Sequence, residues 1–424
     1  MPTPPAEIQA LLLRETLGLL ASYSWQATVM LGPTGFGTSD VDLTLPEFFR
    51  EFRLRHALAT AARLEAIVED IEVAPSHASG IERAETKGTI GGRLDTSRYI
   101  ARRATLRSLP RPYPVIRSVW THNTPENILA RQALGQVHMA MRDNPFPLRS
   151  AESAAAAERL RWAARRISRR PWDDIPSHGL LQRLYNEVDA RIRRRQTGNE
   201  SAYSRLLRWL DQWTLDLHRL GSDDRNDLIR GFLAFPAGNA FWDKVFEVWC
   251  LLFVATTADH LGWTRIEGPA SLRQADGVIY RYVMPSGSEV AIRFQRTEPL
   301  PKGRWSYRGA GALRGIPDVT IATATPGRPP LLIDAKNRFI RTDRISRSDE
   351  IYKMLGYAEN FRPGAGQLSR FRGVLIFPSN RSAHRIVDGP EGGQLDLITV
   401  DLSGNRDPAD AALADALTHW ATVA

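Results

Sequence analysis

The sequence predicts an α/β C-terminal domain with a mixed sheet, preceded by a mixed α+β N-terminal domain and a helical middle segment. Three observations support this division. After residue 231, apolar runs of strand length alternate with segments of helical periodicity. Between residues 151 and 230, apolar residues recur at helical spacing. The length of 424 residues accommodates two or three domains. We therefore place the domains at residues 1–150, 151–230 and 231–424.

The N-terminal residues resemble neither a secretion signal nor a membrane anchor. Their first predicted helix contains Glu7 and Glu15, unlike a basic-then-apolar leader. No apolar stretch approaches the roughly 20 residues that span a bilayer. Cys250 is the single cysteine, which excludes a disulfide framework and cysteine-based zinc sites. We expect a cytoplasmic protein without membrane contacts.

Two short segments of the N-terminal domain stand out. Gly92-Arg93-Leu94-Asp95 leads into an Arg-rich stretch that we predict as a strand. Thr124-Pro125-Glu126-Asn127 opens a predicted helix, in which Thr124 suits the N-cap and Pro125 the first helical position. The glycine-rich run at residues 32–37 lacks the Gly-Lys-Ser/Thr of a phosphate-binding loop, so we predict a turn there.

Positive charge is concentrated in the middle of the chain. The net charge is +9 and the isoelectric point about 9.9. Residues 101–210 contain 21 Arg, no Lys and 9 acidic residues, an excess of 12, so the remainder is slightly acidic. This balance favours a polyanionic partner. The arginines at residues 165–170 and 193–195 are candidates for phosphate contacts; a solvated face that keeps the protein soluble is the alternative.

A helix predicted at residues 239–261 is apolar nearly all round after Lys244, which indicates burial. Glu247 lies within it, and an unpaired buried carboxylate is costly. Metal ligation, or a hydrogen bond to a group near a metal, would offset that cost. A salt bridge to Lys244 or to an arginine would do the same.

In residues 315–338, charged residues interrupt apolar strands. Asp318 opens one predicted strand, and residues 331–336 form the next, across a Pro/Gly turn. Because side chains alternate along a strand, Asp334 and Lys336 point to the same side. Lysine is also rare, with five in a chain that otherwise uses arginine. We therefore predict that Asp318, Asp334 and Lys336 converge at one end of the sheet.

These three residue types suit metal-dependent phosphodiester cleavage. Two carboxylates can hold a hard divalent cation, Mg²⁺ or Mn²⁺, through oxygen. The cation lowers the pKa of a water and neutralises charge in the transition state. A nearby lysine can orient the water or stabilise developing charge. The alternative is an Asp–Lys surface pair at a strand end.

Basic residues follow the second strand. Arg338, Arg341 and Arg344 lie in an Arg-rich loop that suits a nucleic-acid backbone. The helix predicted at residues 349–361 carries Lys353 and Tyr357 four residues apart on one face. Lys353 either reaches a phosphate with Tyr357 beside it, or is a surface lysine above a packed tyrosine.

The pattern Pro317-Asp318 … Asp334-Ala335-Lys336 resembles the PD-(D/E)xK nuclease superfamily, over roughly residues 238–402. The resemblance implies an α/β/α nuclease core and a Mg²⁺-dependent DNA endonuclease. It implies that Asp318 and Asp334 bind metal and that Lys336 positions or activates the water. Glu247 would then be a third ligand or a partner of one, and the carbonyl of Ala335 would complete the shell. Lys353 and Tyr357 occupy the places of a polar and an aromatic residue in the family's following helix.

The order of the parts also resembles McrC-type restriction subunits, which end in such a domain. The segments that carry this resemblance are Gly92–Asp95 and Thr124–Asn127. It implies restriction or anti-phage defence, with a McrB-like AAA+ NTPase as partner, because the chain has no Walker motif of its own. A homo-oligomer is compatible with the sequence.

Two other classes remain open at this point. A degenerate member would bind nucleic acid as a scaffold without cutting, although the complete Asp/Asp/Lys set argues against it. Metal titration would separate that class from an active enzyme. A stand-alone DNA repair nuclease would cut without a separately encoded NTPase.

Overall fold

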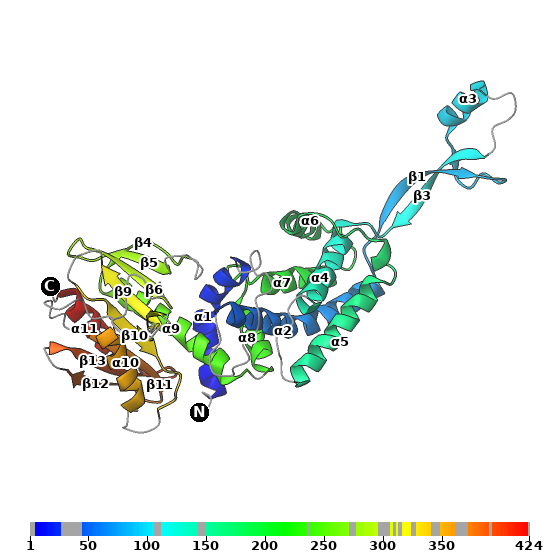
Figure 1. The fold of residues 1–424 in the computed structure, drawn as a ribbon. Helices are drawn as coiled ribbons and strands as arrows, with labels where there is room; N and C mark the ends of the chain where they lie inside the picture. Colours follow the sequence, from blue (N-terminus) through cyan, green and yellow to red (C-terminus); the bar gives the residue numbers. More distant parts are fainter. Residues whose placement is uncertain are drawn as a thin grey trace. The chain divides into compact units, whose positions relative to one another are not determined.

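The computed structural model describes residues 5–26, 45–105, 112–142, 150–235, 237–270, 277–295, 306–307, 311–312, 316–323, 328–340, 348–360, 372–389 and 392–422. The chain forms two compact units (Figure 1). The sheet unit comprises Met1–Arg53 and Phe232–Ala424, and the helical unit comprises Leu54–Gly231. No helix in the described part of the chain is long and apolar enough to cross a membrane.

This division differs from the three predicted domains. The predicted limit at residue 230 lies next to the unit boundary at Gly231, whereas residue 150 lies inside the helical unit. Residues 1–53 belong with the C-terminal part because helix α1 (Ala6–Gln26) packs against helix α9 (Asn239–His260). Glu15 of α1 accepts a 2.7 Å hydrogen bond from the indole of Trp249 in α9. These contacts join segments that are more than two hundred residues apart, and local patterning does not reveal them.

The sheet unit is built around an eight-stranded sheet, in the order β12-β13-β11-β10-β9-β6-β5-β4. The pairs β10–β11 and β11–β13 are parallel, and the other neighbours are antiparallel. The fold of this unit is therefore α/β with a mixed sheet, as the sequence predicts. The strands are β4 (Thr264–Glu267), β5 (Val278–Val283), β6 (Glu289–Phe294), β9 (Val319–Thr323), β10 (Leu331–Ala335), β11 (Arg372–Ser379), β12 (Ala383–Asp388) and β13 (Gln394–Asp401), with β7 (Ser306–Tyr307) and β8 (Gly311–Ala312) forming a separate pair.

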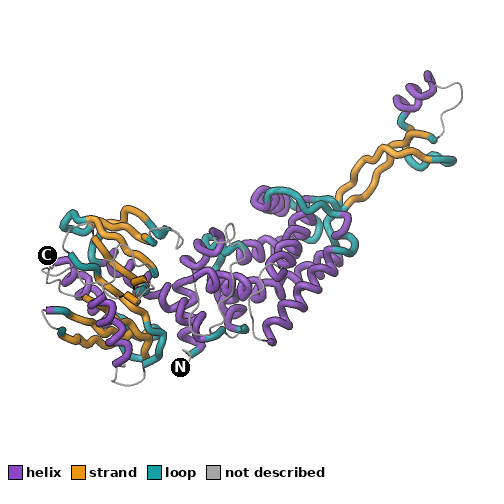
Figure 2. Tube along the Cα trace, in the orientation of Figure 1, coloured by secondary structure: helices purple, strands orange, loops and turns teal. Residues whose placement is uncertain are grey.

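Helices cover this sheet on both faces (Figure 2). Met354 and Tyr357 of α10 (Ser348–Asn360) pack with Leu332, Leu375 and other apolar side chains of one face. On the other face, Arg372 of β11 bonds to His419 of α11 (Asp407–Thr422). Helix α9 packs against α11 and against β9 and β10. Strands β10 and β11 are consequently buried along their whole length, as is usual for strands covered on both faces.

The helical unit has a core of aromatic and aliphatic side chains. Trp209 and Trp213 stack with ring centroids 5.1 Å apart, and the indole of Trp209 donates to the carbonyl of Thr60 at 2.9 Å. The helices are most of α2 (Leu45–Val73), α3 (Thr96–Thr105), α4 (Pro125–Arg142), α5 (Ser150–Ile167), α6 (Leu181–Arg193), α7 (Glu200–Trp213) and α8 (Ser222–Leu233), with a short 3-10 helix at Trp172–Asp174.

An arm extends from the helices of this unit (Figures 1 and 2). It consists of the antiparallel strands β1 (Ala78–Thr86) and β3 (Tyr113–Thr121), the short strand β2 (Arg93–Leu94) and helix α3. The sequence predicts a strand for the Arg-rich stretch after Asp95, and this prediction is wrong, because the stretch is helix α3. The physical reason is Asp95, whose side chain accepts a 3.2 Å bond from the Arg98 amide and so caps the first turn.

The base of the arm is fixed by one buried polar network. The side-chain amide of Asn127 donates to the backbone carbonyls of Ser76 and His122, at 2.7 and 2.8 Å. These residues lie just before β1 and just after β3. The hydroxyl of Tyr203 donates to Asn127 Oδ1 and accepts the Ser76 amide at 2.9 Å. The Thr124–Asn127 segment therefore holds both strands of the arm at their entry and exit.

Replacing Asn127 by Ala should loosen this base. The change leaves the buried Ser76 carbonyl, the partly buried His122 carbonyl and the Tyr203 hydroxyl without the bonds from Asn127, so we expect a loss of about 2–3 kcal/mol in the free energy of unfolding. Urea denaturation measures the loss, and hydrogen exchange of the amides in β1 and β3 should accelerate. Asn123→Ala, at an exposed position four residues earlier, is the matched control. Equal effects of the two substitutions would contradict the anchoring role.

Candidate active site

The register of β9 and β10 brings two carboxylates together. In this antiparallel pair Val319 lies opposite Ile333 and Ile321 opposite Leu331. Extending the register by one residue places Asp318 opposite Asp334. The Oδ2 atom of Asp318 accepts a 2.7 Å hydrogen bond from the backbone amide of Ala335, the residue after Asp334. Both side chains are buried, with 8% of Asp318 and none of Asp334 exposed.

Asp334 is held by charge rather than by hydrogen bonds. Its Oδ2 atom forms an ion pair with Lys336, and its Oδ1 atom lies 3.9 Å from Lys353 Nζ. Within the described residues neither oxygen accepts a hydrogen bond of ordinary geometry. A buried carboxylate with unused acceptor positions has capacity for a further electropositive ligand.

Lys336 is a fixed positive charge at this site. Burial disfavours its charged form, but the negative charges of Asp334 and Asp318 outweigh burial and raise the pKa of Lys336. Its ammonium group also donates to the carbonyl of Ala335 at 3.4 Å. Lys336 is therefore an ammonium donor near neutral pH, which suits charge stabilisation better than proton abstraction.

Glu247 lies in α9 and accepts hydrogen bonds from Lys244 and Gln295. Lys244, one helical turn earlier, donates to both of its oxygens at 2.9 and 3.1 Å, and Gln295 donates to Oε2. The salt bridge to Lys244 is thus present, as one of the two interpretations of the sequence anticipated. The negative charge of Glu247 still acts on the site. Together with burial and the charge of Asp334, it raises the pKa of Asp318.

Gln295 is a site residue that sequence reasoning did not identify. It directly follows β6, the strand next to β9, and its backbone amide donates to the backbone carbonyl of Asp318 at 2.9 Å. Its backbone has φ of 46°, a left-handed conformation that costs a non-glycine residue about 1–2 kcal/mol. Its side chain reaches Glu247. The usable signal was its position at the end of a strand, but only the pairing of β6 with β9 makes that position meaningful.

The residues proposed for nucleic-acid contact have different surroundings. Lys353 has half of its side chain exposed, and its Nζ atom lies 5.5 Å from the ring centroid of Tyr357. Tyr357 is buried, and its hydroxyl donates to the carbonyl of Ile316 at 3.4 Å. Arg338 bonds to both carboxylate oxygens of Glu350, at 3.1 and 2.7 Å. Arg341 and Arg344 lie outside the described residues.

The available ligands suit a hard cation. Carboxylate oxygens from Asp318 and Asp334 and the carbonyl of Ala335 are the donor type that Mg²⁺ and Mn²⁺ prefer. Three carboxylates here face the largely buried ammonium groups of Lys244 and Lys336, and the half-exposed ammonium of Lys353 lies 3.9 Å from Asp334. Among the described residues, no three His, Cys, Asp or Glu side chains are grouped closely enough to hold one ion. A cation at this site would have two aspartates and one carbonyl as its protein ligands, because Glu247 is engaged by Lys244.

Comparison with known proteins gives little similarity. No family model and no curated protein matches the chain. Among solved structures, the chain is similar to one from the refined half-complex of the tetradecameric assembly of Thermococcus gammatolerans McrB AAA+ hexamers with bound McrC. The identity is 12% and the TM-score 0.27, and the match covers 95% of this chain and 75% of that chain. A TM-score of this size does not establish a common fold.

Asp318→Asn should stabilise the protein in the absence of metal. The substitution keeps an acceptor for the Ala335 amide and removes one of three mutually repelling carboxylates. The pKa of Asp318 is raised in the folded state, so ionisation of this carboxyl destabilises the fold at any pH where the unfolded chain ionises it. This destabilisation is absent below about pH 4, where the carboxyl is protonated in both states. We expect a gain on the order of 1 kcal/mol at pH 8 and none at pH 3.5, measured by urea denaturation in EDTA.

The matched control is Asp401→Asn at the end of β13. The carboxylate of Asp401 accepts the amides of Ser403 and Gly404 at 3.1 and 2.8 Å, so its loss should cost about 0.5–1 kcal/mol. Destabilisation by Asp318→Asn at pH 8 would show that the Asp318 carboxylate supports the fold, contrary to the direction of its raised pKa.

Proposed function

We propose that this chain is a metal-dependent nuclease that hydrolyses phosphodiester bonds in DNA, with a PD-(D/E)xK core. The observation that carries the proposal is the placement of Asp318 and Asp334 on facing positions of adjacent central strands, with Lys336 ion-paired to Asp334. A motif that occurs by chance in sequence has no reason to bury two carboxylates side by side. Buried like charges are costly and are retained mainly where they are used.

Each residue of the site has its own task in this proposal. Asp318, Asp334 and the carbonyl of Ala335 would hold Mg²⁺ or Mn²⁺. Bound there, the cation supplies neutralisation of phosphate charge and lowers the pKa of a water. The Lys336 ammonium would donate to the attacking water or to a phosphate oxygen and so stabilise charge as it develops. Glu247, held by Lys244 and Gln295, either joins the ligands or positions one of them.

Lys353 is a further cation close to the carboxylates. Its half-exposed ammonium lies 3.9 Å from Asp334 and above the ring of Tyr357, so its position is set by packing on one side and charge on the other. This placement suits contact with the phosphate of a bound strand. Tyr357 then acts as the support of Lys353 rather than as an independent contact, because its ring is buried.

The second part of the proposal is a role in restriction or anti-phage defence with a McrB-like AAA+ NTPase. It rests on the Gly92–Asp95 and Thr124–Asn127 segments. In the structure the first contains β2 of the arm, and the second supplies Asn127 at the base of the arm. One segment thus lies in the arm and the other, which is buried, anchors its base, and this supports interpreting them as one functional element rather than two chance matches.

Cleavage assays test both parts together. We expect the purified chain to cut plasmid or linear DNA in Mg²⁺ or Mn²⁺, either alone or when a McrB-type NTPase and its nucleotide are added. EDTA should abolish cutting. Asp334→Asn and Lys336→Met should each lower the rate by about 10²-fold or more, because each removes a charge that acts on the reacting phosphate.

Asp401→Asn serves as the matched carboxylate control and should cut like wild type. A requirement for the NTPase would support the defence role, and cutting without it would favour a stand-alone repair nuclease. Absence of cutting under every condition, together with equal Mn²⁺ binding by wild type and Asp334→Asn, would overturn the enzyme proposal and leave a nucleic-acid-binding scaffold.

A further inference from the structure

Helix α5 uses its arginines in two different ways. On one side, Arg159 pairs with Glu65, and Arg166 pairs with Glu69 and Glu72, all three from α2. The indole of Trp172 adds a 2.7 Å hydrogen bond to Glu72. These arginines have a structural task, because they hold α5 against α2 and their charges are neutralised.

The other side of the helix carries an uncompensated row of charge. Arg161, Arg165 and Arg169, here called the arginine row, are all exposed and follow one another at intervals of four residues. Within the described part of the chain Arg165 and Arg169 form no ion pair, and Arg161 donates only to the carbonyl of Ala157 at 3.3 Å. The spacing places Arg161 and Arg165 on one helix face, about 6 Å apart along the axis, and Arg169 lies in the turn that directly follows the helix.

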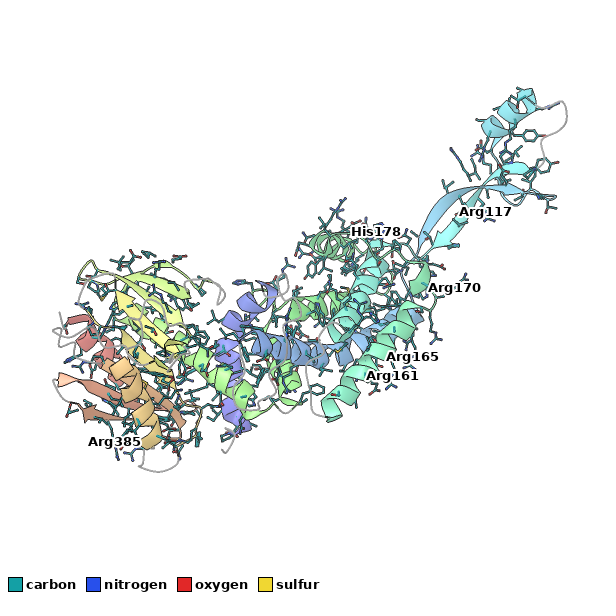
Figure 3. The ribbon with its side chains drawn as sticks, viewed as in Figure 1. Arg117, Arg161, Arg165, Arg170, His178 and Arg385 are labelled. Atoms are coloured by element: carbon teal, nitrogen blue, oxygen red, sulfur yellow. The ribbon has the colours of Figure 1, made fainter. Side chains whose placement is uncertain are left out.

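The direction of this face is fixed by packing. Trp162 and Ala163, which lie between members of the row, are buried, so the helix cannot turn the row inwards. Figure 3 shows Arg161 and Arg165 following one another along α5, with Arg170 beyond them toward the arm. Arg170 is partly compensated by Asp174 at 3.5 Å and is left out of the row.

A surface that only kept the protein soluble would carry interleaved signs of charge. Neighbouring like charges four residues apart destabilise a helix slightly, by about 0.2–0.5 kcal/mol per pair. The same helix pairs its other arginines with acids, so the row is an exception within one element. Such an exception is explained by a partner that supplies the negative charge.

The chemistry that matches the row is the phosphate backbone of a duplex. Double-stranded DNA presents about one charge per 1.7 Å of axis, so a row about 12 Å long meets several phosphates. Guanidinium groups suit phosphate oxygens because they can donate two parallel hydrogen bonds. Contacts of this kind fix position without reading sequence.

We propose that the arginine row of the helical unit is a binding surface for duplex DNA, separate in the chain from the carboxylates of the sheet unit. The surface needs neither metal nor cleavage, so it goes beyond the proposed nuclease activity while sharing its substrate. It assigns to α5 and its C-terminal turn the role of retaining DNA, with Arg165 and Arg169 as the main contacts.

The test is DNA binding by the full-length chain in EDTA, measured by fluorescence anisotropy of a labelled duplex of about 30 base pairs over a range of salt concentrations. The triple substitution Arg161→Gln, Arg165→Gln, Arg169→Gln should weaken binding at least about 10-fold at low salt. The slope of log affinity against log salt should become shallower by up to about 0.9 per lost contact. The corresponding triple lysine variant should recover most of the affinity, because lysine keeps the charge.

The matched control removes the same charge elsewhere in the helical unit, by Arg103→Gln, Arg183→Gln and Arg208→Gln at exposed positions of α3, α6 and α7. It should change affinity less than about 3-fold. Thermal unfolding of both triple variants checks that each is folded. Equal losses in the two would mean that only net charge matters, and unchanged binding by the row variant would point to an acidic protein partner; either result overturns the inference.

This readout is independent of cutting, because the duplex stays intact in EDTA. A chain that binds through the row but never cuts would sustain this inference and contradict the proposed nuclease. A chain that cuts but binds equally well without the row would do the reverse.

Discussion

The candidate site depends on the antiparallel register of β9 and β10. This pairing sets Asp318 opposite Asp334, and the bond from the Ala335 amide to Asp318 locks the two strand ends together. The neighbouring groups respond to the resulting negative charge. Lys336 pairs with Asp334, Lys244 pairs with Glu247, and Gln295 accepts a left-handed backbone conformation while its side chain bonds to Glu247. Burial, together with the charges of Glu247 and Asp334, raises the pKa of Asp318, so the site is built at a cost to stability, as expected where charge is kept for use.

Sequence reasoning reached the parts of this site that are local. Asp334 and Lys336 interrupt an apolar strand, and alternation alone puts them on one side. It reached Glu247 because a carboxylate in a helix that is apolar nearly all round needs a partner. Gln295 could not be found in this way, since its importance follows from β6 lying beside β9, which is a non-local pairing. The sequence predicts a strand where α3 lies, because no residue of α3 is buried and the helix therefore has no apolar core face to mark it, whereas the cap supplied by Asp95 favours the helix.

The arginines discussed here fall into three groups that differ in their partners. The structure distinguishes these groups, whereas the sequence shows only that arginine is frequent. Arg159 and Arg166 neutralise acids of α2 and build the helical unit. Arg338 is bound to Glu350 and ties the segment after β10 to α10. Arg165 and Arg169 carry charge that the described part of the protein does not compensate. A count of basic residues treats these groups alike, whereas among the three described here the last kind keeps its charge available to a polyanion.

In our proposal Asp318 and Asp334 together hold a divalent cation, and the most direct test is the position of that cation. A crystal of the full-length protein grown with Mn²⁺, with diffraction measured at the manganese absorption edge, locates the ion by its anomalous signal. We predict a peak within about 2.0–2.6 Å of oxygen atoms from both aspartates and of the Ala335 carbonyl. Manganese bound only elsewhere, with the Lys336–Asp334 ion pair intact and no peak between the two carboxylates, would contradict the proposal.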